Sequence, residues 1–253
     1  MPWRRRKSNA VLWLIILILL GLVAFAYRAE LSGYFAKIKN YFSSPAEKKN
    51  QTIEQPSEYS LAKFPKDNLK EKELDINGDG HNEIFLTSFA AKKPYAVLAD
   101  ARDRTKGLSE IFDFSVSAAE YDFTSEETPE VSDLQDLNSD GEREIIIDLK
   151  SYGAYTGTFG ILSFASGKIN WVTLKEKNGS MRPAVFQDGA SVRNAEVFRV
   201  MEEAGKKVIL DLDGYTDIEG RWSWEGAVYV WDGKNYAYNS ALTDKFLKEI
   251  PHP

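Results

Sequence analysis

The sequence contains no cysteine and only two histidines among its 253 residues. Disulfide bonds, thiolate nucleophiles and cysteine-ligated metals are therefore excluded, and so is a zinc site built from several histidines. The sequence also lacks a Gly-rich phosphate loop and a GxSxG nucleophile elbow, and it offers no histidine to pair with a serine. These absences predict that the protein is not an enzyme.

Acidic residues outnumber basic ones, and the imbalance grows once the N-terminus is set aside. Residues 1–28 hold five Lys and Arg and no acid, so the remaining chain has 27 basic against 38 acidic residues and a net charge of −11. An acidic surface argues against nucleic acid and anionic lipid as partners. It suits a chain that collects divalent cations.

The N-terminus has the pattern of a membrane anchor. A basic tail, residues 1–9, precedes an apolar run over residues 10–27 that is just long enough to span a bilayer as a helix. The basic tail is expected in the cytoplasm, which places the rest of the chain in the periplasm or at the cell surface. The stretch Ala24-Phe25-Ala26 also has the form of a signal-peptide cleavage site, and cleavage there would give a secreted protein.

The next segment favours a retained anchor. Large apolar residues recur at helical spacing over residues 28–42, which predicts an amphipathic extension of the apolar helix. These residues are Leu31, Tyr34, Phe35, Ile38, Tyr41 and Phe42. Residues 43–60 are polar, contain two prolines and show no periodicity, so they are predicted to form a flexible linker.

Residues 61–240 are predicted to be all-β. Short runs such as EIFLTSF, EIIIDLK and AVYVW are rich in β-branched and aromatic residues and are separated by Gly, Asn, Asp or Ser. Turns at Gly80, Gly141 and Gly205 recur 61 and 64 residues apart. This period predicts about three four-stranded, blade-like repeats in a partial or compact propeller-like assembly. Helical spacing returns only in ALTDKFLKEI, which predicts a C-terminal helix and tail over residues 241–253.

Two of the turns carry acids and amides at alternating positions. Three carboxylates this close repel one another unless a cation offsets them. Six to eight oxygens at about 2.3–2.6 Å suit Ca²⁺, so we predict two calcium sites. The first uses the side chains of Asp75, Asn77, Asp79 and Glu83 with the backbone carbonyl of His81, and the second uses Asp136, Asn138, Asp140 and Glu144 with the carbonyl of Glu142.

The same turns have a simpler interpretation, because NGDG and NSDG are strong turn sequences without any metal. The recurrence of five positions in two loops at a repeat-like interval favours metal binding. The third turn keeps Gly205 but has Val200, Ala204 and Val208 at positions one, five and nine. No third site is expected there.

The form D-x-[DN]-x-D-G-x-x-[DE], leading into an apolar strand about every sixty residues, resembles the FG-GAP/VCBS repeats of integrin-α-type β-propellers. The resemblance covers roughly residues 70–240 and is carried by the two acidic turns. It implies calcium loops that join β-strands. Position nine is Glu83 and Glu144, where that family more often has Asp. Closed propellers have four to eight blades, so three repeats imply a compact assembly or an open array that another chain completes.

Two aromatic loops are candidates for ligand stacking against a sugar or peptide. The candidate residues are Tyr152, Tyr155, Tyr215, Trp222 and Trp224. Packing between blades is the simpler role and the one we favour, since aromatic rings carry a large apolar area.

These patterns predict a single-pass, membrane-anchored, extracytoplasmic calcium-binding β-repeat protein that acts as a binding or scaffolding module for an unknown protein or glycan ligand. The alternative from another class is a carbohydrate-active enzyme that uses Asp211, Asp213, Asp217 or Glu219, which lie beside the aromatic residues. A third hypothesis is a subunit that completes a larger cell-surface complex.

Overall fold

The computed structural model describes residues 59–117, 127–151, 156–191 and 194–250. The predicted basic tail, membrane anchor and amphipathic extension, residues 1–42, lie outside the described residues, as does most of the predicted linker. Within the described part, no helix is both long enough and apolar enough to cross a bilayer.

The first sheet contains six strands, and all of its pairings are antiparallel. The strand order is β1-β5-β4-β3-β2, and β6 pairs with β4. The strands are β1 (Tyr59–Ser60), β2 (Lys70–Leu74), β3 (Glu83–Ala90), β4 (Lys93–Asp100), β5 (Lys106–Gly107) and β6 (Phe112–Asp113). Two short helices, η1 (Leu61–Lys63) and α3 (Phe114–Ser117), follow β1 and β6.

The second sheet contains eleven strands in the order β12-β11-β17-β16-β15-β14-β13-β9-β8-β7, and β10 pairs with β9. The strands are β7 (Glu130–Gln135), β8 (Glu144–Ser151), β9 (Thr156–Ala165), β10 (Lys168–Trp171), β11 (Thr173–Lys175), β12 (Met181–Pro183), β13 (Val185–Ala190), β14 (Asn194–Glu203), β15 (Lys206–Thr216), β16 (Trp222–Trp231) and β17 (Tyr236–Tyr238). Among the described strands, β11 and β17 form the one parallel pair. Helix α4 (Ser240–Glu249) follows the last strand.

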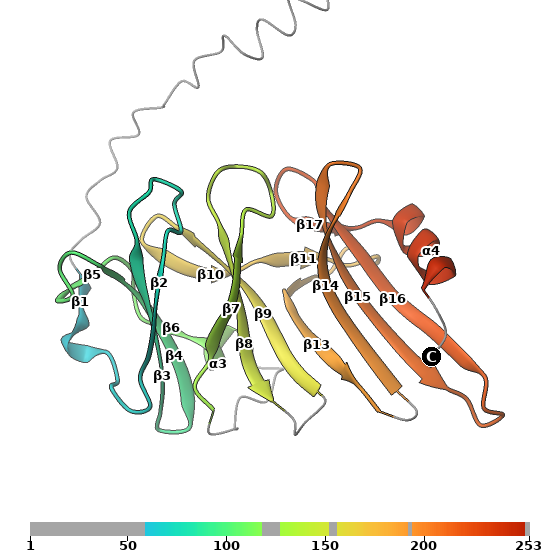
Figure 1. Ribbon diagram of the computed structural model, residues 1–253, viewed down its shortest axis with the longest axis horizontal. Coiled ribbons are helices and arrows are strands. Elements are labelled where there is room, and N and C mark those ends of the chain that lie inside the picture. The colour runs from blue at the N-terminus through green and yellow to red at the C-terminus, as the bar shows by residue number, and fades with distance from the viewer. Residues whose placement is uncertain (1–58, 118–126, 152–155, 192–193, 251–253) are drawn as a thin grey trace, which may run out of the picture. The chain divides into compact units, whose positions relative to one another are not determined.

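The prediction of an all-β fold is confirmed, but the strands do not separate into three blades. Strand β13 pairs with β9 on one side and with β14 on the other, so it joins the second and third predicted units into one sheet. The described strands form two open sheets and do not close into a ring. Figure 1 shows the β2–β3, β7–β8 and β14–β15 connections along the same upper edge.

The largest apolar core is shared by the two sheets. Leu74, Phe85 and Leu98 of the first sheet belong to the same buried cluster as Ile145 and Ile147 of β8. Ile146, the residue between them, faces a second buried cluster. Both faces of β8 are therefore covered, which explains why this strand reads as a continuous apolar run.

Helix α4 covers one face of β15 and β16. Its apolar side chains pack against Val208, Leu210, Leu212 and Val228. The helix begins after Asn239, whose side chain accepts a hydrogen bond from the Leu242 N–H at 3.0 Å. Thr243 fixes the helix to the sheet, because its hydroxyl accepts from the Val228 N–H at 2.9 Å. Asp211 and Asp213 lie on the opposite face of β15, whereas Asp217 and Glu219 lie in the turn between β15 and β16.

We predict that Gly226→Ala lowers the free energy of unfolding by about 2–4 kcal/mol. A Cβ at Gly226 would lie 2.2 Å from the carbonyl oxygen of Asp211, and its φ of 137° disfavours a side chain. Gly233→Ala is the matched control, because Gly233 also has a positive φ but has no atom within 4 Å of an added Cβ. Urea unfolding measures both variants. Equal losses would contradict the close pairing of β15 with β16.

Candidate functional site

The candidate site consists of two loops at the upper edge of the sheets in Figure 1. The first acidic loop, residues 75–82, joins β2 to β3, and the second acidic loop, residues 136–143, joins β7 to β8. Position nine of each pattern, Glu83 or Glu144, is the first residue of the strand that follows. Each loop therefore ends where a core strand begins.

The two loops share one hydrogen-bond pattern, position by position. In the first, the side chains at positions one, three, five and nine accept from the backbone N–H groups at positions six, five, seven and two. The bonds are Gly80 N to Asp75 Oδ2 (3.3 Å), Asp79 N to Asn77 Oδ1 (3.0 Å), His81 N to Asp79 Oδ1 (2.7 Å) and Ile76 N to Glu83 Oε2 (3.0 Å).

The second loop repeats all four bonds. They are Gly141 N to Asp136 Oδ2 (3.1 Å), Asp140 N to Asn138 Oδ1 (2.9 Å), Glu142 N to Asp140 Oδ1 (2.9 Å) and Leu137 N to Glu144 Oε2 (2.8 Å). Position six is Gly80 or Gly141, with φ of 85° and 94°, a conformation that favours glycine. The loops are thus two copies of one local structure.

The glutamates at position nine are buried. Glu83 is 9% exposed and Glu144 is 4% exposed. Burial raises the pKa of Glu144 from 4.5 to about 7, with Asp140 and Asp136 adding to the rise and the bond from Leu137 N–H opposing it. Burial also raises the pKa of Glu83. Each loop therefore holds a carboxyl group whose ionised form needs a nearby positive charge.

Each loop also leaves one buried carboxylate oxygen without a hydrogen-bond partner among the described residues. These atoms are Oδ1 of Asp75 and Oδ1 of Asp136, which occupy position one in both loops. Buried polar atoms are rarely left unpaired in native proteins. A cation at each loop would give these oxygens a partner, so the residues present fit the ion that the sequence predicts.

In neither loop do the acidic side chains surround a common position that a metal ion could occupy. Within the described ranges, no three acidic or histidine side chains already form a group that would hold a metal ion. In the first loop the Asp79 carboxylate instead accepts from the His81 N–H and the Asn77 amide, at 2.7 and 3.1 Å. A bound ion would have to draw these side chains inward. The side chains of His81 and Glu142 are exposed, as expected if only their carbonyls contribute.

Tyr236 is a neighbour of the second loop that the sequence did not reveal. It lies on β17, is 1% exposed, and its hydroxyl has no hydrogen-bond partner among the described residues. Burial raises its pKa, and the nearby carboxylates of Glu144, Asp136 and Asp140 raise it further. The sequence showed only an aromatic strand at this point, because the approach of β17 to the loop depends on tertiary pairing.

The third connection differs from the first two. Strands β14 and β15 are joined by a tight turn at Ala204 and Gly205, with φ of 51° and 75°. Glu203 and Lys206 pair directly on either side of it. The connection is too short to form the nine-residue pattern.

The described residues of the candidate aromatic loops lie on two faces of the sheet. Trp222 and Trp224 lie on one face, over Gly214, and their rings meet edge to face at 5.6 Å. Tyr215 pairs with Ser223 and therefore points to the opposite face, where it is 42% exposed. Tyr152 and Tyr155 lie outside the described residues. Neighbouring positions on a strand alternate between faces, so Tyr215 does not share a surface with Trp222 and Trp224.

Most of the acids proposed for an enzyme are paired with arginine. Asp211 accepts from Arg182 Nη2 at 2.6 Å, and burial raises the pKa of Asp211 to about 6 while Arg182 opposes the rise. Asp217 and Glu219 both pair with Arg221 at 2.8 Å. Arg182 also contacts Glu176 and Tyr229. Such a network has a structural role, since it joins β12 to β15 and β16.

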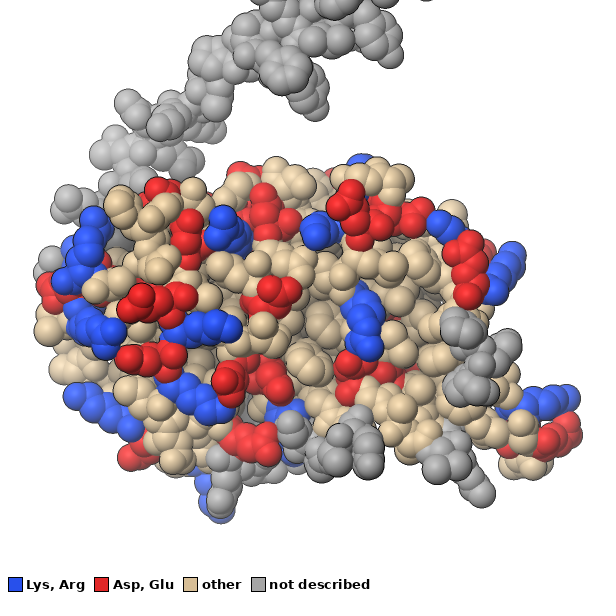
Figure 2. Space-filling view, viewed as in Figure 1, with Lys and Arg blue, Asp and Glu red and all other residues tan. Residues whose placement is uncertain are grey.

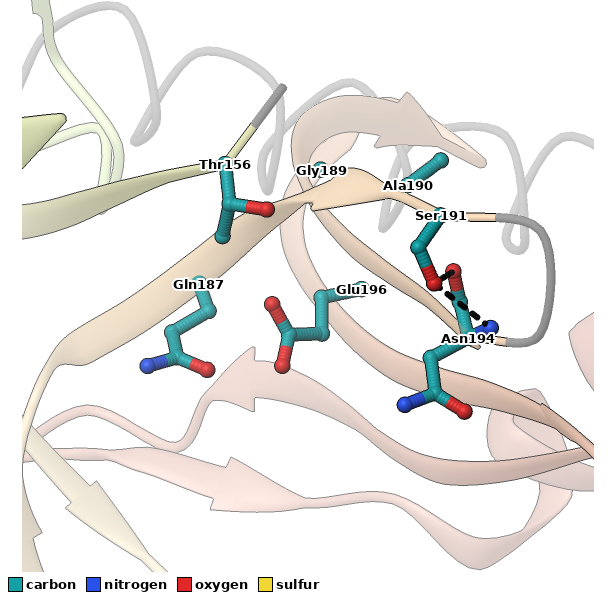
Figure 3. Close-up of a pocket in the computed structure, with 7 residues that line it drawn as sticks. All are labelled: Thr156, Gln187, Gly189, Ala190, Ser191, Asn194 and Glu196. Atoms are coloured by element: carbon teal, nitrogen blue, oxygen red, sulfur yellow. Dashed lines mark hydrogen bonds between the residues drawn. The ribbon is translucent and has the colours of Figure 1, made fainter. Parts of the chain in front are cut away.

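A separate pocket of about 370 Å³ lies at the ends of β13 and β14, and Figure 3 shows its lining. Gln187 and Glu196 project into it from the two strands. With the amide nitrogen of Gln187 turned towards Glu196, the two side chains form a hydrogen bond of 2.7 Å. Most residues that line the pocket are polar and one of them, Glu196, carries a carboxylate, and sequence reasoning gave no sign of the pocket.

No protein-family model, curated protein or solved structure matches the chain. The functional account therefore depends on the residues of the two loops and on their geometry.

We predict that calcium-free protein loses stability as the pH rises from about 4.5 to 7. The raised pKa of Glu144 means that the folded state holds this proton more tightly than the unfolded state, so the stabilisation is present at low pH and is lost on ionisation. Glu144→Gln should remove this loss and be about 2–3 kcal/mol more stable than the native protein near pH 7.5. Thermal unfolding across this pH range measures the effect.

Glu249→Gln, at the exposed end of α4, is the surface control for this experiment. A stability difference between Glu144→Gln and the native protein that does not change with pH would contradict the buried, raised-pKa state of Glu144.

Proposed function

We propose that this protein is an extracytoplasmic calcium-binding β-repeat protein, held at a membrane by its N-terminal helix, that binds or scaffolds a protein or glycan partner. The observation that carries the proposal is the repetition of one hydrogen-bond pattern in both acidic loops, with a buried oxygen left unpaired at position one of each. A plain turn needs neither the buried glutamate nor the unpaired oxygen.

The ligand chemistry favours Ca²⁺. Asp75, Asn77, Asp79, Glu83 and the His81 carbonyl offer only oxygen, and the second loop offers the equivalent set. Hard oxygen ligands in a loop of flexible geometry suit Ca²⁺, whereas Mg²⁺ demands a strict octahedron and keeps more water. The ion would offset the repulsion among the carboxylates and lower the pKa values of Glu83 and Glu144, which burial raises.

The same loops support a relationship to FG-GAP/VCBS repeats. Each acidic loop leads directly into a core strand, β3 or β8, as the resemblance implies. We infer that the three sequence units are related repeats whose third member lost the loop. The joining of the second and third units by β13 is then a departure from separate blades, and the open sheets leave edges at which another chain can complete the array.

A carbohydrate-active enzyme is the second candidate, favoured by one observation. Glu196, Asp213 and Glu225 face one another across β14, β15 and β16, and burial raises the pKa values of Glu196 and Asp213. Glycoside hydrolysis uses two carboxyl groups beside the scissile bond, and the one that acts as the general acid has a raised pKa. A screen of the protein on glycans distinguishes the candidates, because turnover that Glu196→Gln and Asp213→Asn abolish would replace the binding role with a catalytic one.

We predict that calcium raises the melting temperature of the protein and that chelation lowers it. External calcium modules have dissociation constants of about 10⁻⁴–10⁻³ M. At ten times that concentration each site adds about 1.4 kcal/mol to the free energy of unfolding. Asp79→Ala and Asp140→Ala should each remove at least half of the calcium-dependent increment, since each takes a ligand from one of the two loops.

Asp232→Ala is the matched control. Asp232 also accepts from backbone N–H groups, those of Lys234 and Asn235, but it lies in a turn without the acidic pattern. The calcium-dependent increase in the free energy of unfolding should be the same in Asp232→Ala as in the native protein. Equal melting temperatures with and without 10 mM calcium would refute the calcium proposal.

The proposed location predicts a protease result. A protease added to intact cells or spheroplasts should digest the β domain, because the basic N-terminus holds only residues 1–9 in the cytoplasm. Protection of the domain until the membrane is broken would contradict export. A mature chain that begins at Tyr27 would show that the segment is a cleaved signal peptide.

A further inference from the structure

The two acidic loops contact each other directly. The backbone N–H of Arg143 donates to the carbonyl of Ile76 at 2.8 Å. The guanidinium of Arg143 donates to the carbonyl of Asp75 at 3.1 Å and lies 3.8 Å from its carboxylate. One residue of the second loop thus binds the start of the first loop through both its backbone and its side chain.

A second contact lies on the opposite part of the first loop. A Cβ added at Gly78 would lie 3.0 Å from the carbonyl oxygen of Gly141, so the two backbones are in close contact there. Gly78 is position four of the first loop, and Gly141 is position six of the second. The two loops are therefore in contact at two points, so a conformational change in one loop affects the backbone of the other.

The contact residues are neighbours of proposed ligands. Arg143 stands between Glu142 and Glu144 of the second site, and Ile76 stands between Asp75 and Asn77 of the first. The bond from Arg143 N–H to Ile76 carbonyl therefore joins the backbones of the two ligand sets without using a ligand atom.

We propose that the two loops bind calcium cooperatively, with Arg143 as the positioning residue that couples them. This inference depends on the proposed calcium function. An ion in the second loop fixes the backbone around Glu142 and Glu144, which holds the Arg143 N–H on the Ile76 carbonyl and orders the start of the first loop. The first loop then loses less conformational freedom when its own ion binds, so its affinity rises.

The side chain of Arg143 has the opposite effect on the first site. Its guanidinium lies beside the Asp75 carboxylate, where it competes with an incoming cation. The backbone bond supplies the coupling, whereas the charge weakens the first site. The two contributions are separable, because a substitution at Arg143 removes the guanidinium and keeps the N–H.

The test is calorimetric calcium titration of the full-length chain in a mild detergent, for the native protein and for Asp79→Ala and Asp140→Ala. We expect the affinity of the remaining site in each variant to be at least about fivefold weaker than that site in the native protein. Linkage requires the two losses to be the same factor. The native protein should bind two ions with a Hill coefficient above one.

The possible failures are distinguishable. If the native protein binds no calcium at 10 mM, both the proposed function and the proposed coupling are refuted. If the native protein binds two ions independently, and each variant keeps the native affinity at its remaining site, the calcium function stands and the coupling is overturned. Should either variant fail to fold, the Hill coefficient of the native protein decides.

Arg143→Met separates the charge from the backbone bond. It should raise the calcium affinity of the first loop about two- to fivefold, the effect of an exposed ion pair, and keep the Hill coefficient above one. Arg104→Met is the matched control, since Arg104 pairs with Glu71 and Glu73 of β2, which are not proposed ligands, and its titration should match the native protein. An unchanged affinity in Arg143→Met would overturn the role given to its charge.

Discussion

The glutamate at position nine is the constraint on which the structure around the loops depends. In each loop its buried carboxylate accepts the backbone N–H at position two, so the second residue of the loop is held to the first residue of the following strand. The same glutamate is the first residue of β3 or β8, and later residues of these strands lie in the shared core. A buried carboxylate is costly unless hydrogen bonds and a nearby positive charge offset that cost. The position-nine glutamate therefore stabilises the loop and is also a proposed ligand of the ion.

Sequence patterns predicted those structural features that depend on residues close together in the chain. The short runs rich in β-branched and aromatic residues predicted strands, and one of them, EIIIDL, is buried on both faces in the structure. The spacing of Asp75, Asn77, Asp79 and Glu83 anticipated a loop with a defined internal structure, because the hydrogen bonds of such a loop join residues only two to seven positions apart.

Contacts between distant segments were beyond the reach of sequence reasoning. The segment AVFQDGA has no strong alternation, yet β13 joins the two halves of the large sheet. Trp222 and Tyr215 were both candidates for ligand stacking, and only the register of β15 against β16 shows that they lie on opposite faces. The approach of Tyr236 to the second loop and the bond from Arg143 to Ile76 likewise depend on how strands pack. Figure 2 shows acidic and basic side chains mixed over the visible face, a distribution that net charge alone does not give.

The central claim is that two ions occupy two equivalent loops, and equilibrium dialysis against radioactive calcium tests it most directly. The account predicts two ions bound per chain at saturation, at millimolar or lower free calcium. A double variant, Asp79→Ala with Asp140→Ala, should bind none. Zero ions per native chain, or a double variant that still binds two, would contradict the account and leave the loops as turns.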